Sequence, residues 1–469
     1  MSAAAIPDQS DQSWRAHISG TLRIGVPLIA AQIAQQAIQV TDTVMLGWYG
    51  TEELAASVLG TTMFFIAFIV AIGLAQAVMP LAASAEGAGD QRAVRRSVRM
   101  GLWAVWLIAL LMVPVLYQGE ALFLLTGQDA GLAAMADDYL DIALWGLIPA
   151  GTLMALRSFL SAVERTGIVM WATIGGVVIN AAANWALIFG NWGAPELGIR
   201  GAAIASVLSH AAVLVPVVIY CTRHSVLRQY EVFVRIWRAD WPAFFEVLRL
   251  GLPISGTLLA EVGLFAASSL MMGWLGAVAL AAHGIALQVI SIIFMIPLGL
   301  AQAATARVGR AHGRQDPNGI ARAARAAMAM AVIIAILGAI LLWLIPEVLV
   351  GLFLADTDEN APAVIRTGAL LLLVAAFFQL VDTVQVVSAG LLRGLKDTRV
   401  PMVIAVFSYW AVGIPVAYAL GFALDLGGVG VWAGLAVGLC LAAILLASRF
   451  MAAERDGFGL AGAGRGGAG

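Results

Sequence analysis

Charge is scarce in this sequence: only 12% of its 469 residues are charged, whereas 61% are hydrophobic. A soluble domain could not remove that much apolar surface from water, so we take lipid to be its solvent. Cysteine is scarcer still. Cys221 and Cys440 fall at or inside predicted membrane spans and are too few for a disulfide framework, so we assign them no role. These shortages exclude a soluble globular domain and a fold built on disulfides.

Enzyme motifs are missing as well. The single lysine, Lys396, lies in LLRGLKDTRVP, which is not a phosphate-binding loop, and no HExxH or nucleophile-elbow sequence occurs. ATP hydrolysis by that route is excluded, which leaves an ion gradient as the energy source. We expect a protein that is not an enzyme, has no cofactor other than Na+ or H+ as coupling ion, and binds no nucleic acid.

One aspartate-rich segment imitates an enzyme motif. DDYLD at 137–141 matches the pattern by which prenyl-transferring enzymes hold magnesium and diphosphate. It occurs once, without a second acidic cluster, and the topology derived below places it outside, at the start of the fourth span, where acids favourably face a helix N-terminus. A membrane prenyltransferase would need it on the cytoplasmic face. We interpret the segment as structural.

Long charge-free apolar segments are abundant. Most are long enough to cross a bilayer once, which takes about 20 residues. With the interrupted stretches added they give twelve transmembrane helices, so the predicted fold class is an all-α integral membrane protein. The spans begin near residues 18, 53, 95, 132, 167, 199, 244, 279, 322, 362, 400 and 428.

The basic residues indicate a topology. Of the 26 lysines and arginines, only Arg200 and Arg366 fall outside one set of alternate loops and the two termini. Cytoplasmic loops carry the excess of Lys and Arg, so both termini are predicted to be cytoplasmic, which requires an even number of spans. We expect a multi-pass protein of the bacterial inner (plasma) membrane.

The two halves of the sequence repeat each other. A shift of 226 residues lays MLGWYG at 45–50 on MMGWLG at 271–276, and GLAQA at 73–77 on GLAQA at 299–303. Each copy holds six spans, an even number, so both copies enter the membrane with the same orientation. They are parallel repeats, related by an axis along the membrane normal.

Two six-helix lobes are therefore predicted, with a substrate cavity between lobes that rock to alternate access. A channel also fits this symmetry, but no filter-like loop is present. The expected parts are an N-terminal tail at 1–14, a first lobe at 15–222, a cytoplasmic linker at 223–241, a second lobe at 242–452 and a Gly-rich, disordered C-terminal tail at 453–469.

Three carboxylates fall where hydrocarbon is expected: Asp42 in the first span, Glu261 in the seventh and Asp382 in the tenth. A charge at the bilayer centre costs roughly 2.5–3.5 kcal/mol on insertion scales, so each needs a compensating interaction. The basic residues are all expected at span ends or in loops, so the counter-charge must come from outside the chain. A buried carboxylate without a fixed partner takes a proton or coordinates a small cation. The alternative is a hydrogen bond between helices or a position nearer the interface.

Amides accompany the acid of the tenth span. Gln379 and Gln385 lie three residues on either side of Asp382 and could add oxygen ligands of the type that sodium prefers. Glu261 belongs to the same lobe. We expect a shared coupling site there, with a transient Na+ at Glu261 and Asp382 and no tightly bound metal.

Amides also accompany the acid of the first span. Asn180 and Asn184 are four residues apart on the fifth span, hence on one helix face. With Asp42 they would form a second polar site in the first lobe. The alternative is that these amides only fasten the bundle through hydrogen bonds between helices.

Four segments carry a family resemblance. They are VTDTVMLG at the end of the first span, GLPISGTLLAE in the seventh, QLVDTVQVVSAGLLRGLKDTRVP in the tenth span and its loop, and LRSFLSAVERTG after the fourth. Together they resemble the multidrug and toxic compound extrusion (MATE) family, and its NorM-like bacterial branch in particular. The resemblance covers nearly the whole chain.

The resemblance implies two six-helix bundles in a V shape that exchange sodium or protons for organic, often cationic and aromatic, compounds. It implies a cation site at Glu261 and Asp382, and a first-lobe acid at Asp42 with Asn180 nearby. Branches with a first-lobe proton site carry an additional acid in span five or six, and this sequence has none there. We expect a monomeric antiporter for multidrug efflux and xenobiotic export, with coupling centred on the second lobe.

A lipid-linked precursor flippase of the same superfamily is the alternative function. Such a protein would be expected to line its central cavity with basic residues that hold a diphosphate. The sequence places its basic residues outside the spans, which favours the antiporter.

The distribution of basic residues predicts that both termini and the 223–241 linker face the cytoplasm. Tags inserted at these three places should be accessible to a membrane-impermeant reagent only from the cytoplasmic side. A periplasmic C-terminus would rule out twelve spans and, with them, the parallel repeat.

Overall fold

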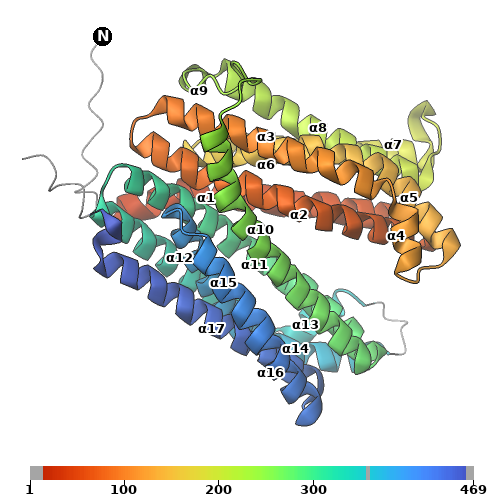
Figure 1. Ribbon diagram of the computed structural model, residues 1–469. Helices are drawn as coiled ribbons and strands as arrows, with labels where there is room; N and C mark the ends of the chain where they lie inside the picture. The colour runs from red at the N-terminus through yellow and green to blue at the C-terminus, as the bar shows by residue number, and fades with distance from the viewer. Residues whose placement is uncertain (1–13, 355–359, 461–469) are drawn as a thin grey trace, which may run out of the picture. The chain divides into compact units, whose positions relative to one another are not determined.

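The computed structural model describes residues 14–354 and 360–460, and within these ranges every regular element is a helix (Figure 1). Eleven of the described helical segments are long and apolar enough to cross a membrane. The twelfth long helix is α1, Trp14–Tyr49, whose 36 residues exceed the thickness of a bilayer but include Gln32, Gln35, Gln39 and Asp42. The predicted all-α class with twelve spans is confirmed, and each predicted span start lies within five residues of a helix start.

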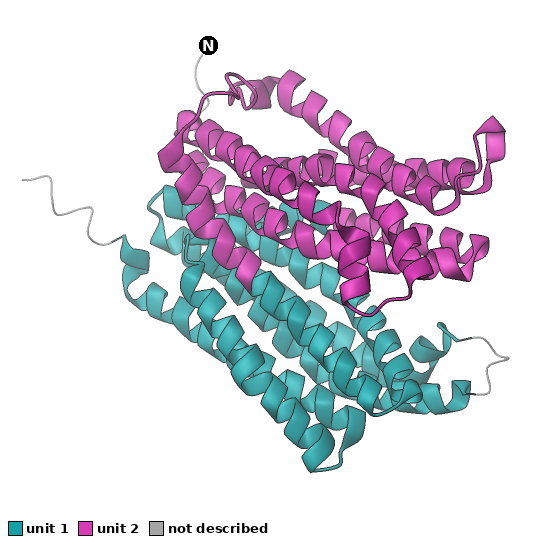
Figure 2. Ribbon diagram, turned by 45° about the vertical axis from the view of Figure 1, so that its right-hand side comes forward, with its two compact units in different colours: residues 1–29, 257–469 teal, residues 30–256 magenta. Residues whose placement is uncertain are grey.

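The helices form two compact units (Figure 2). Unit 2 covers residues 30–256 and unit 1 the described residues up to 29 and from 257 onward. In the first repeat, α1 is followed by α2 (Thr51–Gly87), α3 (Gln91–Leu116), α4 (Gly119–Leu125), α5 (Ala130–Ala143), α6 (Leu147–Ala162), α7 (Gly167–Phe189), α8 (Gly198–Arg223) and α9 (Ser225–Arg228). In the second repeat, the helices are α10 (Trp241–Trp274), α11 (Ala277–Gly313), α12 (Pro317–Leu344), α13 (Pro346–Gly351), α14 (Ala361–Gly394), α15 (Arg399–Val406), α16 (Ile414–Tyr418) and α17 (Gly427–Arg455).

Two of the predicted spans are composite. The fourth consists of α5 and α6, joined by one 3₁₀ turn at Leu144–Gly146. The eleventh begins with α15, continues through a π-helical segment at Phe407–Gly413 and α16, and ends with a second π-helical segment at Ala419–Ala423. Single π turns inside helices occur frequently at functional sites, so this span is a candidate part of the functional site.

The units do not follow the predicted lobe boundaries at α1 and α10. The first part of α1, up to Ile29, packs within unit 1, and the first part of α10, up to Gly256, packs within unit 2. Each repeat thus contributes half of its first helix to the packing of the other repeat. The predicted lobes at 15–222 and 242–452 therefore stay a prediction. The first half of α1 and the first half of α10 belong to the other unit than the one these boundaries would give.

The duplicated GLAQA motif explains this exchange. In unit 2, a Cβ on Gly73 of α2 would lie 2.5 Å from the backbone nitrogen of Ser255 on α10. In unit 1, a Cβ on Gly299 of α11 would lie 3.0 Å from the backbone nitrogen of Ile29 on α1. These two contacts are related by the same shift of 226 residues. Glycine is required at both positions because only a residue without a side chain lets the two backbones approach so closely.

The linker at 223–241 is fixed to α3 and is part of unit 2. The Trp103 indole donates a hydrogen bond to the carbonyl oxygen of Ile236 at 2.8 Å, and the buried Tyr230 hydroxyl donates to Glu86 at 2.6 Å. Arg96 forms a two-pronged ion pair with Asp240, and the hydrogen bonds from its guanidinium lower the pKa of that carboxyl. The linker is therefore an ordered segment that is packed against unit 2.

The C-terminal tail begins later than predicted. Helix α17 continues to Arg455 and a 3₁₀ turn follows at Gly457–Gly459, so residues 453–460 of the predicted disordered tail are ordered. The reason is apolar packing, since Phe458 is buried and its ring lies 5.7 Å from that of Phe450. The remaining tail residues, 461–469, and residues 1–13 of the N-terminal tail lie outside the described residues.

Three glycines at four-residue spacing join α17 to the composite eleventh span. The spacing of Gly430, Gly434 and Gly438 predicts close helix packing. A Cβ on Gly434 would lie 2.2 Å from the Cα of Ala417, and a Cβ on Gly438 would lie 2.9 Å from the carbonyl oxygen of Ser408. Close packing at these glycines is confirmed.

Gly434→Ala is expected to destabilise the protein by about 1–3 kcal/mol, the usual cost of overpacking, because the new methyl group would collide with backbone atoms of Ala417. The melting temperature of the purified protein in detergent measures this loss. Gly284→Ala on α11 is the matched control, since a Cβ there meets no described atom within 4 Å and alanine favours a helix by roughly 1 kcal/mol over glycine. Equal melting temperatures for the two variants would contradict the packing argument.

Candidate functional site

Two of the predicted acids come together in unit 1. Glu261 lies on α10, half-buried, and Asp382 lies on α14 with 5% of its surface exposed. The two side chains are close enough for their charges to repel each other. Like charges in a poorly hydrated place cannot both stay ionised without compensation. The pair therefore requires a proton, a cation or a positive side chain.

Buried polar side chains lie on the same helix as Asp382 and on the neighbouring π-helical segment. On α14, Gln379 is three residues before Asp382, and Thr383 directly follows it. The π-helical segment contributes Ser408 and Tyr409, and the charges of both acids act on the Tyr409 hydroxyl. Both amide atoms of Gln379 and the hydroxyls of Thr383, Ser408 and Tyr409 have no hydrogen-bond partner within the described ranges.

These buried polar groups have a physical consequence. A buried polar group without a hydrogen-bond partner costs about 1–3 kcal/mol, so a cluster of them needs an explanation. Carboxylate, amide and hydroxyl oxygens are the ligands that hard cations prefer. Gln385, the second predicted amide, is also buried on α14. Groups of three or more His, Cys, Asp or Glu side chains that could hold a metal do not occur in the part of the chain that the structure describes.

The π-helical segment is held against α10 beside Glu261. The Trp410 indole donates a hydrogen bond to the carbonyl oxygen of Ala260 at 3.1 Å. Its ring lies on Gly263, where a Cβ would approach the indole to 2.6 Å. This contact joins the middle of the π-helical segment, next to Tyr409, to α10. Sequence reasoning missed Tyr409, one of two tyrosines within the charge-free run at 400–424.

Arg157 and Arg393, which the sequence assigned to span ends or loops, both lie within helices. Arg393 is in the last turn of α14, and its charge acts on Glu261. Arg157 is buried in α6 and donates a hydrogen bond to Gln32 at 2.6 Å. The helices extend further than the hydropathy indicated, which brings both residues into spans. The expectation that the acids have no basic partner in the chain is therefore wrong for Glu261.

The third predicted acid forms a separate site in unit 2. Asp42 Oδ1 accepts hydrogen bonds from the amides of Asn180 at 2.8 Å and Asn184 at 2.6 Å, and Asp42 Oδ2 accepts one from the Ser206 hydroxyl at 2.9 Å. Both asparagines are fully buried on α7. Three donors hold the carboxylate without a positive side chain, which is how a charged acid is tolerated away from water. The structure thus brings together the three residues that the sequence grouped.

Two further residues belong to the Asp42 site and were not predicted. Ser206 comes from α8, and Tyr139 from α5 is close enough for the charge of Asp42 to act on it. The Tyr139 hydroxyl accepts a hydrogen bond from Thr61 at 3.2 Å. A serine in a charge-free span is too common in membrane helices to identify a site by itself.

The DDYLD segment has a structural role that differs from the predicted one. Helix α5 begins at Ala130 with Asp129 as its cap, so the segment lies in the middle of this helix and not at its N-terminus. Asp137 instead accepts a hydrogen bond from the backbone of Glu120, in the first turn of α4, at 3.0 Å. Asp138 pairs with Arg200 at 2.7 Å. The aspartates thus fasten neighbouring elements.

The MatE family model matches residues 27–186 and 253–419 of this chain. The chain belongs to the MatE family. The two matched segments cover the two repeats, and they include Asp42 with Asn180 in one and Glu261 with Asp382 in the other. Membership confirms the resemblance seen in the four sequence segments and makes the chain a multi-pass membrane protein.

Relatives of this MatE protein carry names that agree with the predicted NorM-like branch. A Rhizobium meliloti protein named "Probable multidrug resistance protein NorM" is 49% identical over 445 residues, which cover 94% of this chain and 95% of the relative. A Synechocystis protein of the same name is 36% identical, with 92% and 93% covered. The NorM-like branch is therefore confirmed.

Solved structures share the fold. The eukaryotic MATE transporter AtDTX14 superposes with a TM-score of 0.84 at 22% identity, covering 95% of this chain and 98% of that one. A MATE protein in a bent conformation gives a TM-score of 0.84 at 18% identity, with 95% and 99% covered. At these identities the likeness establishes the fold alone.

Replacing Asp137, Asp138 and Asp141 of this MatE protein with Asn should leave drug resistance largely intact, because the first two aspartates only fasten helices. The exposed Asp138–Arg200 pair is expected to contribute little to stability, because solvent screens it. Growth of expressing cells on a toxic dye measures the outcome. Lost resistance in a variant that inserts normally would show that the segment takes part in transport.

Proposed function

We propose that this protein is a cation-coupled antiporter that exports organic, often cationic, drugs and toxic compounds by alternating access of its two lobes. It resides in the bacterial inner membrane as a monomer with both termini in the cytoplasm. The coupling ion is Na+ or H+. Family membership and the multidrug-resistance names of the relatives support the transport of organic compounds.

The observation that carries the proposal is the half-buried Glu261 close to the buried Asp382, in a unit where buried polar groups on α14 and the π-helical segment lack partners among the described residues. Two acids so placed can share a proton or coordinate one small cation. The amides of Gln379 and the hydroxyls of Thr383 and Tyr409 supply further oxygens. This chemistry suits an ion that binds and leaves, because the ligands are present without a closed metal site.

Charge balance indicates how many ions the site takes. Glu261 and Asp382 carry two negative charges when ionised, and Arg393 offsets one of them. The remaining negative charge matches one monovalent cation, either a proton or Na+. Once that cation is bound the site is neutral, and a neutral site is the form that tolerates a closed, poorly hydrated environment. We therefore propose one coupling ion at this site per cycle.

The Asp42 site supports transport in a different way. Its carboxylate is already satisfied by Asn180, Asn184 and Ser206. No positive side chain is hydrogen-bonded to it, so we propose that the site can hold a cationic compound or ion in its place. Coupling therefore rests on the second repeat, and the first repeat contributes a fixed negative site.

Asp382→Asn should abolish uphill export while leaving insertion and melting temperature unchanged or slightly improved, because it removes a charge whose burial is unfavourable. Glu261→Gln should also abolish uphill export, but it leaves the charge of Arg393 without its acid and is therefore expected to lower the melting temperature. A ligand drives a conformational change only through its different affinity for the two states, so losing the ion site removes the response to an imposed gradient. The measurement is efflux of a fluorescent organic cation from proteoliposomes under separate Na+ and H+ gradients.

Glu347→Gln is the matched control, since it makes the same substitution at an exposed position of α13 in the same unit. It should retain full coupling to the gradient. Full coupling in both site variants would refute the assignment of the ion site. Misfolding of both would indicate that the acids only hold the helices together.

A further inference from the structure

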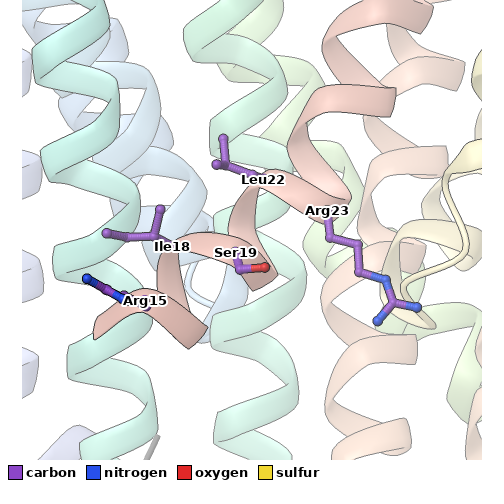
Figure 3. Close-up of a pocket in the computed structure, with 5 residues that line it drawn as sticks. All are labelled: Arg15, Ile18, Ser19, Leu22 and Arg23. Atoms are coloured by element: carbon purple, nitrogen blue, oxygen red, sulfur yellow. The ribbon is translucent and has the colours of Figure 1, made fainter. Parts of the chain in front are cut away.

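The first turns of α1 have two unlike faces. On one face, His17, Thr21 and Ile24 are all buried within unit 1. The other face bears the exposed side chains of Figure 3, where Arg15 and Arg23 point away from each other. The buried face is therefore the one through which this segment is held in the structure.

Arg307 of α11 fastens the buried face. Its guanidinium group donates hydrogen bonds to the Thr21 hydroxyl at 2.6 Å and to the backbone carbonyl oxygen of His17. A second nitrogen of the same group lies 3.1 Å from Nδ1 of the His17 ring. The guanidinium lies against the helix at Gly20, where a Cβ would be 3.2 Å from its central carbon. One arginine thus joins the start of α1 to α11 through three polar contacts.

The contact with Arg307 determines where the His17 ring carries its proton. A guanidinium group has only donors, so Nδ1 has to accept and cannot carry a proton. The single proton of the neutral ring is then on Nε2. A protonated ring would turn an N–H group toward the N–H groups of Arg307, which would break this hydrogen bond and bring two positive charges together. Full attachment of α1 to α11 therefore requires a neutral His17.

The other charged groups that act on His17 do not reverse this requirement. On α12, the positive charge of Arg322 acts on the ring in the same sense as that of Arg307. Asp316, which caps α12 and accepts a hydrogen bond from the backbone of Gly319 at 2.8 Å, acts in the opposite sense and more weakly than either arginine. Burial of the ring also disfavours its charged form. The surroundings of His17 as a whole favour the neutral ring.

We propose that His17 and Arg307 form a pH-sensitive latch, which holds the start of α1 on α11 while His17 is neutral and releases it when acidification of the cytoplasm protonates the ring. The proposal goes beyond the coupling of transport to an ion, since neither residue belongs to the sites at Glu261 and Asp382 or at Asp42. It rests on the predicted topology, in which α1 begins on the cytoplasmic side.

Proton linkage gives the direction and the pH range of the release. A histidine that is free of the latch titrates at about pH 6.5. Above that pH both states are neutral, and the latch keeps its full stability. Below it the released state binds a proton that the latched state disfavours, so the latch weakens as the pH falls.

The released segment is one of the two helix halves that the repeats exchange. Residues up to Ile29 of α1 pack within unit 1, whereas the rest of this helix belongs to unit 2. Its first turns are too short to be stable as a helix without packing, because short isolated helices are marginal in water. Release of the latch should therefore expose the backbone amides of these turns to solvent.

Hydrogen–deuterium exchange of the full-length protein in neutral detergent, followed by mass spectrometry, tests this. We compare the protection factors of the amides of residues 18–23 at pH 7.5 and pH 5.5, because these factors already correct for the intrinsic effect of pH on exchange. We expect about a tenfold loss of protection at pH 5.5, the change that linkage gives for one histidine that titrates at about pH 6.5 only when released.

His17→Asn keeps an oxygen that can accept from Arg307 but cannot be protonated, so it should remove the tenfold change. His17→Lys places a permanent positive charge beside Arg307 and should lower the protection already at pH 7.5. His312→Asn is the matched control, since it removes another histidine from α11 in the same unit, and it should keep the wild-type response.

Three results would overturn the latch: equal protection of the wild-type segment at the two pH values, a full response in His17→Asn, or a response that His312→Asn abolishes. The measurement needs neither an ion gradient nor a transported compound. Its failure is therefore distinguishable from a failure of the proposed function.

Discussion

The structure depends above all on the cost of placing charge in hydrocarbon. Only 12% of the residues are charged, and most of the basic ones end helices or lie in loops. Three of the charges that lie within spans have local partners. Asp42 accepts three hydrogen bonds, Arg157 donates to Gln32, and Glu261 has Arg393. The Glu261–Asp382 pair keeps one negative charge that no described side chain neutralises, so it stands out as the place where an ion can act.

A second constraint is the close approach of helices at glycine. Lipid tails are as apolar as leucine, so helices in a membrane associate through tight packing and not through hydrophobic burial. Gly73 and Gly299 allow each repeat to hold half of the other repeat's first helix. The chain consequently passes between the two units only inside α1 and α10, because the linker at 223–241 is fastened within unit 2. Any movement between units has to be absorbed by those two helices, near the duplicated Pro27 and Pro253, where a hydrogen bond of the helix is missing.

Much of this arrangement could be predicted from the sequence, and the failures share one cause. The spans follow from hydropathy, which is a local property of the sequence. The repeat follows from comparing the sequence with itself, which needs no knowledge of the structure. The grouping of Asp42 with Asn180 and Asn184 follows from their four-residue spacing and from span order. The sequence assigned Arg393 to the loop after the span because the apolar stretch of α14 ends before the helix itself ends. Tyr409 depends on a π turn and on the contact of Trp410 with Gly263, which no periodicity reveals. The exchange of helix halves involves contacts between residues far apart in the chain.

The two repeats have corresponding helices but carry their acidic residues at different positions. Under the shift of 226 residues, Asp42 corresponds to Ser268, and Glu261 corresponds to Gln35. The acid of the second repeat therefore lies seven residues, about 10 Å, further from the outer end of its helix than the acid of the first.

That displacement explains why the two sites are compensated differently. Near the outer end, neutral donors suffice for Asp42. At the corresponding place in the second repeat, Ser268 and its neighbour Ser269 lie against His283. The His283 ring also accepts a hydrogen bond from Trp432 at 3.0 Å. This position in the second repeat therefore has no acid. Seven residues earlier along its helix, Glu261 lies near Asp382, and the charge of Arg393 acts on it. The two repeats thus place their acids at different positions along corresponding helices, so that one repeat holds its acid with neutral donors and the other brings two acids together.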